Sequence, residues 1–182
     1  MNDYFNIDLT ELENKNYHGC NSNMLAMMTE AASVCFNKHN HSNPVCCSAK
    51  GIFTKDYIIN YKTVDDSMLA TYNDRDRAVE DGSYSIAFAI IEGYTGLKPW
   101  LKSAKGNGFD YHVGIDCNNI IRFKPIARLE VSGIFKSNSN NSIENRYKEK
   151  VDRLSKYEDS SPVYIVIVEY SKPQIKVGGL NV

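Results

Sequence analysis

The chain has 182 residues, of which 42% are hydrophobic and 24% are charged, and its formal net charge is −1. These proportions are typical of globular proteins and exclude a wholly disordered or fibrous protein, while the length predicts one domain with one core. The charge excludes the strongly basic class of nucleic-acid-binding proteins, so any surface for polyanions must be local.

The apolar runs and the cysteines indicate where the protein is located and whether its thiols are reduced. No apolar run reaches the roughly 20 residues that cross a bilayer, and the first residues lack the basic and apolar regions of a secretion signal. The five cysteines are odd in number, with no CxxC pair to form half of a thiolate metal site. We therefore expect a cytoplasmic protein with reduced thiols and no membrane partner.

The N-terminal part, residues 1–73, is predicted to be a helix and β-hairpin extension packed on the core. After a polar, aperiodic opening, apolar residues recur at helical spacing over 21–37 and predict a helix. Two β-prone runs within 45–62 predict a hairpin or a pair of short strands. We expect this extension and the core, residues 74–182, to form a single compact domain overall.

The core begins with the strongest helix pattern, over 74–96, where polar residues give way to an apolar half that ends at glycines. Strand candidates follow at 108–115 and 127–134, separated by a polar CNN turn and an apolar-basic stretch. Residues 142–156 have the pattern of an amphipathic surface helix. Residues 162–170 form a β-branched run without alternation, typical of a central strand covered on both faces. The order predicts a layered α/β fold.

Three acidic residues of the core lie at positions where a solvent-exposed charge is not expected. Glu80 lines up in helical projection with Tyr84 and Ala87, so its carboxylate is predicted to face inward. Asp110 and Glu130 lie among apolar residues of the two strand candidates, which we expect to be neighbours in one sheet. Carboxylate oxygens suit a hard divalent cation such as Mg²⁺, which activates water and neutralises charge on phosphate.

The arrangement resembles the PD-(D/E)XK nuclease-like superfamily over roughly residues 74–173. The features that carry the resemblance are Glu80 in an early helix, a Gly-x-Asp strand ending at Asp110, and Glu130-x-Ser132 on the next strand, followed by a helix and an apolar strand. The resemblance implies a restriction-endonuclease-like core of helix, mixed sheet, helix and strand. It also implies that Glu80, Asp110, Glu130 and Ser132 are the catalytic positions.

The resemblance further implies a metal-dependent phosphodiesterase, an endonuclease that uses Mg²⁺ or Mn²⁺. Asp110, Glu130, the backbone carbonyl of Val131 and Glu80 would then hold the metal or its water. Nucleic acid would be the partner, with DNA favoured over RNA, and a homodimer or a protein partner is compatible with it. A role in bacterial defence or nucleic-acid processing follows from the same analogy.

Two positions depart from the family pattern. Ser132 stands where the family has a lysine that orients and deprotonates the attacking water, and Phe109 stands where proline is common. Arg128 and Lys136 share strand parity with Glu130, and either could supply a positive charge instead. The runner-up interpretation is therefore a catalytically inactive protein of the same fold that acts as a binding or regulatory partner. A third is an unrelated α/β structural or immunity protein.

Two other patterns are weighed and set aside. Cysteines and histidines between residues 35 and 46 have only a loose zinc spacing, and core cysteines with loop histidines are the preferred interpretation. Basic residues of the late helix alternate with acidic ones, so we expect a solvated, self-paired face rather than a phosphate-binding one. These basic residues are Arg146, Lys148, Lys150, Arg153 and Lys156.

Overall fold

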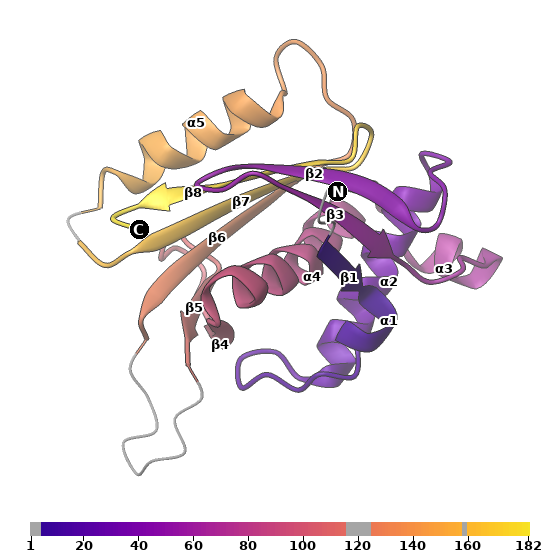
Figure 1. The fold of residues 1–182 in the computed structure, drawn as a ribbon, viewed down its shortest axis with the longest axis horizontal. Coiled ribbons are helices and arrows are strands. Elements are labelled where there is room, and N and C mark those ends of the chain that lie inside the picture. Colours follow the sequence, from indigo (N-terminus) through magenta and orange to yellow (C-terminus); the bar gives the residue numbers. More distant parts are fainter. Residues whose placement is uncertain (1–4, 116–124, 158–159) are drawn as a thin grey trace.

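The computed structural model describes residues 5–115, 125–157 and 160–182 and shows a mixed α/β fold (Figure 1). The elements in chain order are β1 (Phe5–Asp8), α1 (Leu9–Leu12), α2 (Ser22–Asn37), β2 (Val45–Gly51), β3 (Lys55–Asn60), α3 (Asp66–Thr71), α4 (Arg75–Thr95), β4 (Lys98–Lys102), β5 (Tyr111–Gly114), β6 (Ala127–Ile134), α5 (Ile143–Leu154), β7 (Val163–Glu169) and β8 (Gln174–Leu180). Within the described residues, no helix is both long and apolar enough to cross a membrane.

One mixed sheet of eight strands organises the fold, in the order β1-β3-β2-β8-β7-β6-β5-β4. The pairs β1–β3, β2–β8 and β6–β7 are parallel, and the remaining neighbours are antiparallel. Helices α2 and α4 lie on one side of the sheet, and α5 lies on the other (Figure 1). The predicted layered arrangement is therefore confirmed at this level.

The helix predicted over 74–96 is confirmed as α4. Its first turn is capped by Asp74, whose carboxylate accepts hydrogen bonds from the backbone N–H groups of Asp76 and Arg77. The helix ends at Gly96, which has the left-handed conformation that closes a C-terminus (φ 74°). Its apolar half is buried between the sheet and α2.

The predicted central strand is β7, whose side chains are buried on both faces of the sheet. Ile165 and Ile167 belong to a small core beneath α5, whereas Val166 and Val168 belong to the larger core on the α2 and α4 side. A strand buried on both faces has no reason to alternate apolar and polar residues. Burial on both faces therefore explains why the apolar pattern of residues 163–168 is unbroken.

The N-terminal part extends the same sheet. Helix α2 matches the predicted helix, and β2 and β3 pair antiparallel as the predicted hairpin. The opening, expected to be aperiodic, contains β1 and α1, and β4 and β8 were also not predicted. The predicted CNN turn at 117–119 and residues 120–124 lie outside the described residues.

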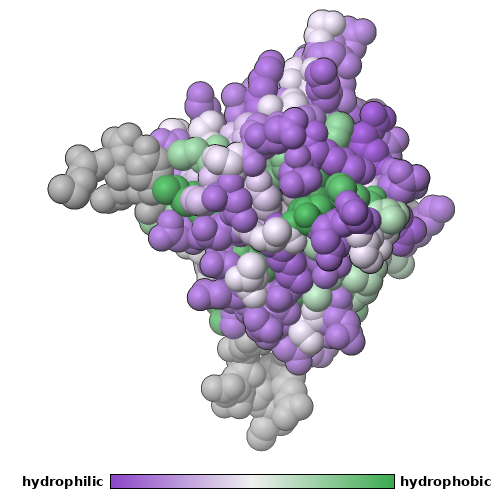
Figure 2. Space-filling model, turned by 90° about the vertical axis from the view of Figure 1, so that its right-hand side faces the viewer, coloured by the Kyte–Doolittle hydropathy of each residue, from purple (hydrophilic) through white to green (hydrophobic). Residues whose placement is uncertain are grey.

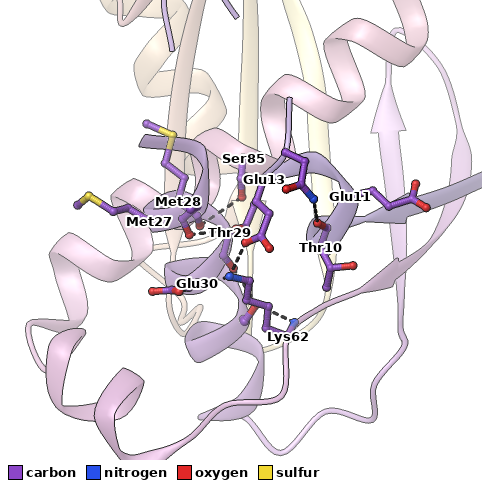
Figure 3. A network of polar contacts seen from close by, with 12 residues as sticks. Thr10, Glu11, Glu13, Met27, Met28, Thr29, Glu30, Lys62 and Ser85 are labelled. Carbon is purple, nitrogen blue, oxygen red and sulfur yellow. Dashed lines mark hydrogen bonds and ion pairs between the residues drawn. The ribbon is translucent and has the colours of Figure 1, made fainter. Parts of the chain in front are cut away.

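A partly buried lysine, Lys62, ties the N-terminal segment to α2 (Figure 3). The Lys62 ammonium forms ion pairs with Glu13, which follows α1, and with Glu30 of α2, 3.3 Å away. The Tyr72 hydroxyl donates to the backbone carbonyl of Met27 in the same helix (2.8 Å). Because α2 packs on α4, these contacts fasten the N-terminal segment to the helix that carries Glu80.

Candidate active site

A cleft of about 1270 Å³ opens beside the second half of β6. Within β6, only residues 127–129 pair with β5. Residues 130–134 of β6 therefore have no strand neighbour on that edge within the described part of the chain. The walls come from the first half of α4, the β4–β5 connection, β6 with the loop that follows it, and α5. All four predicted catalytic positions line this cleft, and so does Val131.

Asp110 lies immediately before β5 and is fixed against the free edge of β6. Its backbone N–H donates to the carbonyl of Leu129 (3.0 Å), and its Oδ2 accepts from the backbone N–H of Val131 (2.7 Å). The N–H and C=O of one strand residue are directed to the same edge. The Val131 carbonyl is therefore also directed toward the edge where Asp110 lies.

Glu130 is buried in β6, with its side chain only 4% exposed. Its Oε1 accepts from Lys150 Nζ (2.7 Å) and from Arg153 Nη2 (2.6 Å), both on α5. Burial raises the pKa of this carboxyl, and the nearby charge of Asp110 raises it further, while Lys150 and Arg153 oppose the shift. A buried acid of this kind needs its cationic partners, and α5 supplies them.

Glu80 corrects one prediction. Its side chain is exposed on the cleft wall, not inward-facing, although Tyr84 and Ala87 on the same helix are buried as expected. The helical stripe was identified correctly, but its first member lies on the side of α4 that borders the cleft, while Val79 and Ser83 of the same helix pack on Gly133 of β6.

Tyr84 is a site residue that the sequence did not indicate as functional. It is buried on α4, and burial raises its pKa well above the ordinary value, as do the charges of Asp110 and Glu80 and a hydrogen bond to Asp110. The phenol therefore stays neutral close to the Asp110 carboxylate. Its pattern in the sequence was that of a core residue of a helix, which it also is.

The Ser132 hydroxyl lies beside the guanidinium of Arg146, whereas the family has a lysine amine at the position of Ser132. Arg146 Nη1 lies 3.4 Å from Ser132 Oγ, and Arg146 Nη2 donates to Asn141 Oδ1 (2.7 Å). Arg128, one of the two cations considered as substitutes, donates to the Ser161 carbonyl (2.9 Å) and is not among the described residues that line the cleft. Lys136, the other, does line it.

The late helix was only partly predicted. A solvated, self-paired face was expected for its five cations, but Arg146, Lys150 and Arg153 line the cleft. Lys148 and Lys156 are exposed as expected. Lys150 and Arg153, which pair with Glu130, thus lie on the same face of α5 as Arg146, which contacts Ser132. Basic and acidic residues alternate along this helix in the sequence, so the sequence did not indicate a basic face.

The donor set of the cleft suits a divalent ion of the Mg²⁺ type. Such an ion takes one or two carboxylates and keeps several waters, so Asp110, Glu130 and the Val131 carbonyl are sufficient in kind, with Glu80 available for a metal water. Within the described residues, no group of three or more histidine, cysteine, aspartate or glutamate side chains is gathered tightly enough to hold a metal ion. In the zinc pattern set aside above, His41 Nε2 is within hydrogen-bond distance of the Tyr170 carbonyl (2.7 Å).

Comparisons of the chain with protein-family models, with curated proteins and with solved structures found no match.

Proposed function

We propose that the protein is a metal-dependent phosphodiesterase, an endonuclease acting on nucleic acid, with DNA favoured over RNA, and that the cleft is its active site. One observation carries the proposal. Acids from three separate elements, Glu80 on α4, Asp110 before β5 and Glu130 in β6, line one cleft that is also lined by cations. Convergence of acids with cations in one cleft is what phosphodiester cleavage requires.

The arrangement of elements supports the proposal. From residue 75 onward the chain runs through α4, the antiparallel strands β4, β5 and β6, helix α5, and then β7, which is parallel to β6. Helices α4 and α5 cover opposite faces of these strands (Figure 1). This agrees with the order of helix, mixed sheet, helix and strand that the PD-(D/E)XK resemblance implies.

In the proposed reaction each side chain has a limited task. Asp110 and Glu130, with the Val131 carbonyl, would hold Mg²⁺ or Mn²⁺, whose chemistry would be to supply a more acidic water and to neutralise charge on the phosphate. The backbone of β6 keeps Asp110 oriented, through the Val131 N–H and the Leu129 carbonyl. Glu80, exposed on the wall, is placed to accept a hydrogen bond from a metal water.

Lys150 replaces the missing strand amine in this proposal. Ser132 cannot accept or donate a proton as an amine does, but Lys150 Nζ already lies 2.7 Å from Glu130 Oε1 and lines the same cleft. Its long side chain reaches the site from α5 instead of from β6. The departure at Ser132 therefore does not leave the site without an amine.

The test is cleavage of single- and double-stranded DNA and RNA with Mg²⁺ or Mn²⁺. We expect metal-dependent cutting by the wild type, a loss of at least about a hundredfold in Asp110→Asn and Glu130→Gln, and a smaller loss in Glu80→Gln. Asp152→Asn is the matched control, because Asp152 is an exposed acid on α5 that does not line the cleft. A folded wild type that cuts none of these substrates would refute the proposal.

The second candidate is a catalytically inactive binding protein of the same fold. The pairing of Glu130 with two cations favours it, because a carboxylate neutralised in this way is stable without a metal. A protein-docking surface of this candidate should be apolar, yet hydrophilic residues cover most of the face shown in Figure 2, where hydrophobic residues form only small patches. Nucleic-acid binding without cleavage, unaffected by metal, is the result that this candidate predicts.

A further inference from the structure

Arg146 of α5 carries a charge that no described acid neutralises. Its guanidinium lines the cleft and contacts two neutral oxygens, Ser132 Oγ (3.4 Å) and Asn141 Oδ1 (2.7 Å). It forms no ion pair with any described residue, whereas the other two cations on this face of the helix both pair with Glu130. The charge of Arg146 is therefore left for a ligand.

The acids of α5 and β6 are engaged or directed elsewhere. Glu144 pairs with a lysine of β8 (3.0 Å), and the exposed Glu149 and Asp152 are not among the described residues that line the cleft. On β6, the residue that follows Glu130 on the same face of the strand is the neutral Ser132. The guanidinium thus lies beside the acids of the cleft, at a neutral position of the strand.

The two contacts of the guanidinium leave hydrogen-bond donors over. A guanidinium has five N–H donors and no acceptor, so three N–H groups of Arg146 have no partner among the described residues. Because the guanidinium only donates, the Asn141 atom that faces it is the carbonyl oxygen, and this fixes the orientation of the amide. Asn141 Nδ2 donates to no described residue either. This part of the wall offers donors and positive charge, which suit an anion.

We infer that Arg146 and Asn141 form a phosphate-binding subsite of the cleft, next to the acids, and that a phosphate group of the substrate binds there. Ser132 and Asn141 hold the guanidinium in place, so its planar fork is oriented before the phosphate arrives. The inference rests on the proposed function for the identity of the substrate. It adds the residues that recognise a phosphate of that substrate.

The test is binding of single- and double-stranded DNA and RNA in EDTA, where metal-dependent cleavage does not occur, at several salt concentrations. Arg146→Gln removes the charge and the donors, so we expect affinity to fall roughly ten- to a hundredfold and the salt slope on single strands to fall by about 0.7. Asn141→Asp keeps the shape of the side chain but neutralises Arg146, and it should cause a similar loss. Arg146→Lys keeps the charge, so it should keep the salt slope while binding less tightly.

Lys148→Gln is the matched control, because it removes one positive charge from the exposed side of α5, outside the described lining of the cleft. It should change affinity by less than about twofold, since an exposed charge at a distance is screened by salt. Equal losses in Arg146→Gln and Lys148→Gln would overturn the inference, because net charge alone would then explain them. Asn141→Asp protein that binds as the wild type does, or a wild type that binds none of the nucleic acids, would also overturn it.

Cleavage assays with Mg²⁺ or Mn²⁺ separate this inference from the proposed function. The expected binding losses, combined with a wild type that cuts nothing, would refute the proposed catalysis and leave the subsite standing. Arg146→Gln protein that binds and cuts as the wild type does would overturn the subsite and leave the phosphodiesterase standing. Circular dichroism checks that each variant is folded, and Asn141→Asp, which conserves size, keeps the test decisive if Arg146→Gln does not fold.

Discussion

Glu130 is a buried acid whose charge is neutralised by two cations. Its carboxylate is almost inaccessible, and both cations that neutralise it come from α5. Removal of one partner of a buried ion pair leaves charge uncompensated, and this costs more than the intact pair contributes. The contacts therefore link the stability of α5 to the chemistry of the cleft.

Replacement of Lys150 by methionine should lower the free energy of unfolding by about 2 kcal/mol, because Glu130 loses a charged hydrogen bond but keeps Arg153. Urea denaturation measures the change. Lys148→Met on the exposed side of α5 is the control, with an expected change within about 0.5 kcal/mol. Adding Glu130→Gln to Lys150→Met should recover part of the loss, and equal effects of both lysine changes would contradict the ion-pair assignment.

The cysteines are chemically unequal. Cys20, Cys35 and Cys47 are buried free thiols, whereas Cys46 is exposed. Burial raises the pKa of Cys20 to about 11 and that of Cys35 to about 12 from the ordinary 9.0. Since the thiolate is the reactive form, the buried thiols should be inert in the folded protein.

A thiol reagent should therefore label Cys46 rapidly and the three buried thiols only after unfolding, as peptide mapping by mass spectrometry can show. The sign of the pH dependence follows from the raised pKa values. The fold favours the protonated thiols, so their contribution to stability is complete below pH 9.0 and is lost as pH rises through about 11 for Cys20 and about 12 for Cys35. Rapid labelling of Cys35 in the native state would contradict the burial.

Helix α4 packs closely on α2 at Gly82. A Cβ atom on Gly82 would lie 2.7 Å from the backbone N of Ala32 and 2.8 Å from its Cα, so there is no room for a side chain between the two helices at this position. Gly93 in the same helix has no atom within 4 Å of its Cβ position. The two glycines thus serve as a matched pair.

Gly82→Ala should destabilise the protein by about 1–3 kcal/mol through overpacking, despite the better helix propensity of alanine. Gly93→Ala should stabilise it by up to about 1 kcal/mol, because only the propensity changes. Thermal unfolding of both variants is the measurement. A stabilised Gly82→Ala protein would show that α2 and α4 are further apart than described.

The elements that could be predicted from sequence are those with strong local signals. Helices α4 and α5 have clear periodicity and caps, β6 alternates apolar and polar residues, and β7 is an apolar run of strand length. Strands β4 and β8 have no such signal, because β4 is a short edge strand with a bulge and β8 contains Gly178 and Gly179. Gly178 lies beneath the Tyr147 ring, so its role depends on a helix distant in sequence.

For the molecule as a whole, β8 is the strand that joins the two halves of the chain. It lies between β2 and β7, so the N-terminal strands and the strands that carry the acids belong to one sheet. The acids could be proposed from their positions in a helix and two strands. Their cationic partners could not, because Lys150 and Arg153 meet Glu130 only when α5 packs across β6 and β7.

The exposure of Glu80 also depends on the whole molecule. A helical projection gives the face on which a residue lies but not where the covering sheet stops. Glu80 lies on the side of α4 that borders the cleft, so the carboxylate is solvated. The same opening that exposes Glu80 leaves the edge of β6 without a strand neighbour at residues 130–134.

Whether Asp110 and Glu130 are metal ligands can be tested by a titration with Mn²⁺ followed by electron paramagnetic resonance of the free ion. We expect a binding site in the wild type that is lost in Asp110→Asn and in Glu130→Gln and is retained in Asp152→Asn. Absence of wild-type binding, or equal binding by all four proteins, would contradict the assignment of Asp110 and Glu130 as metal ligands.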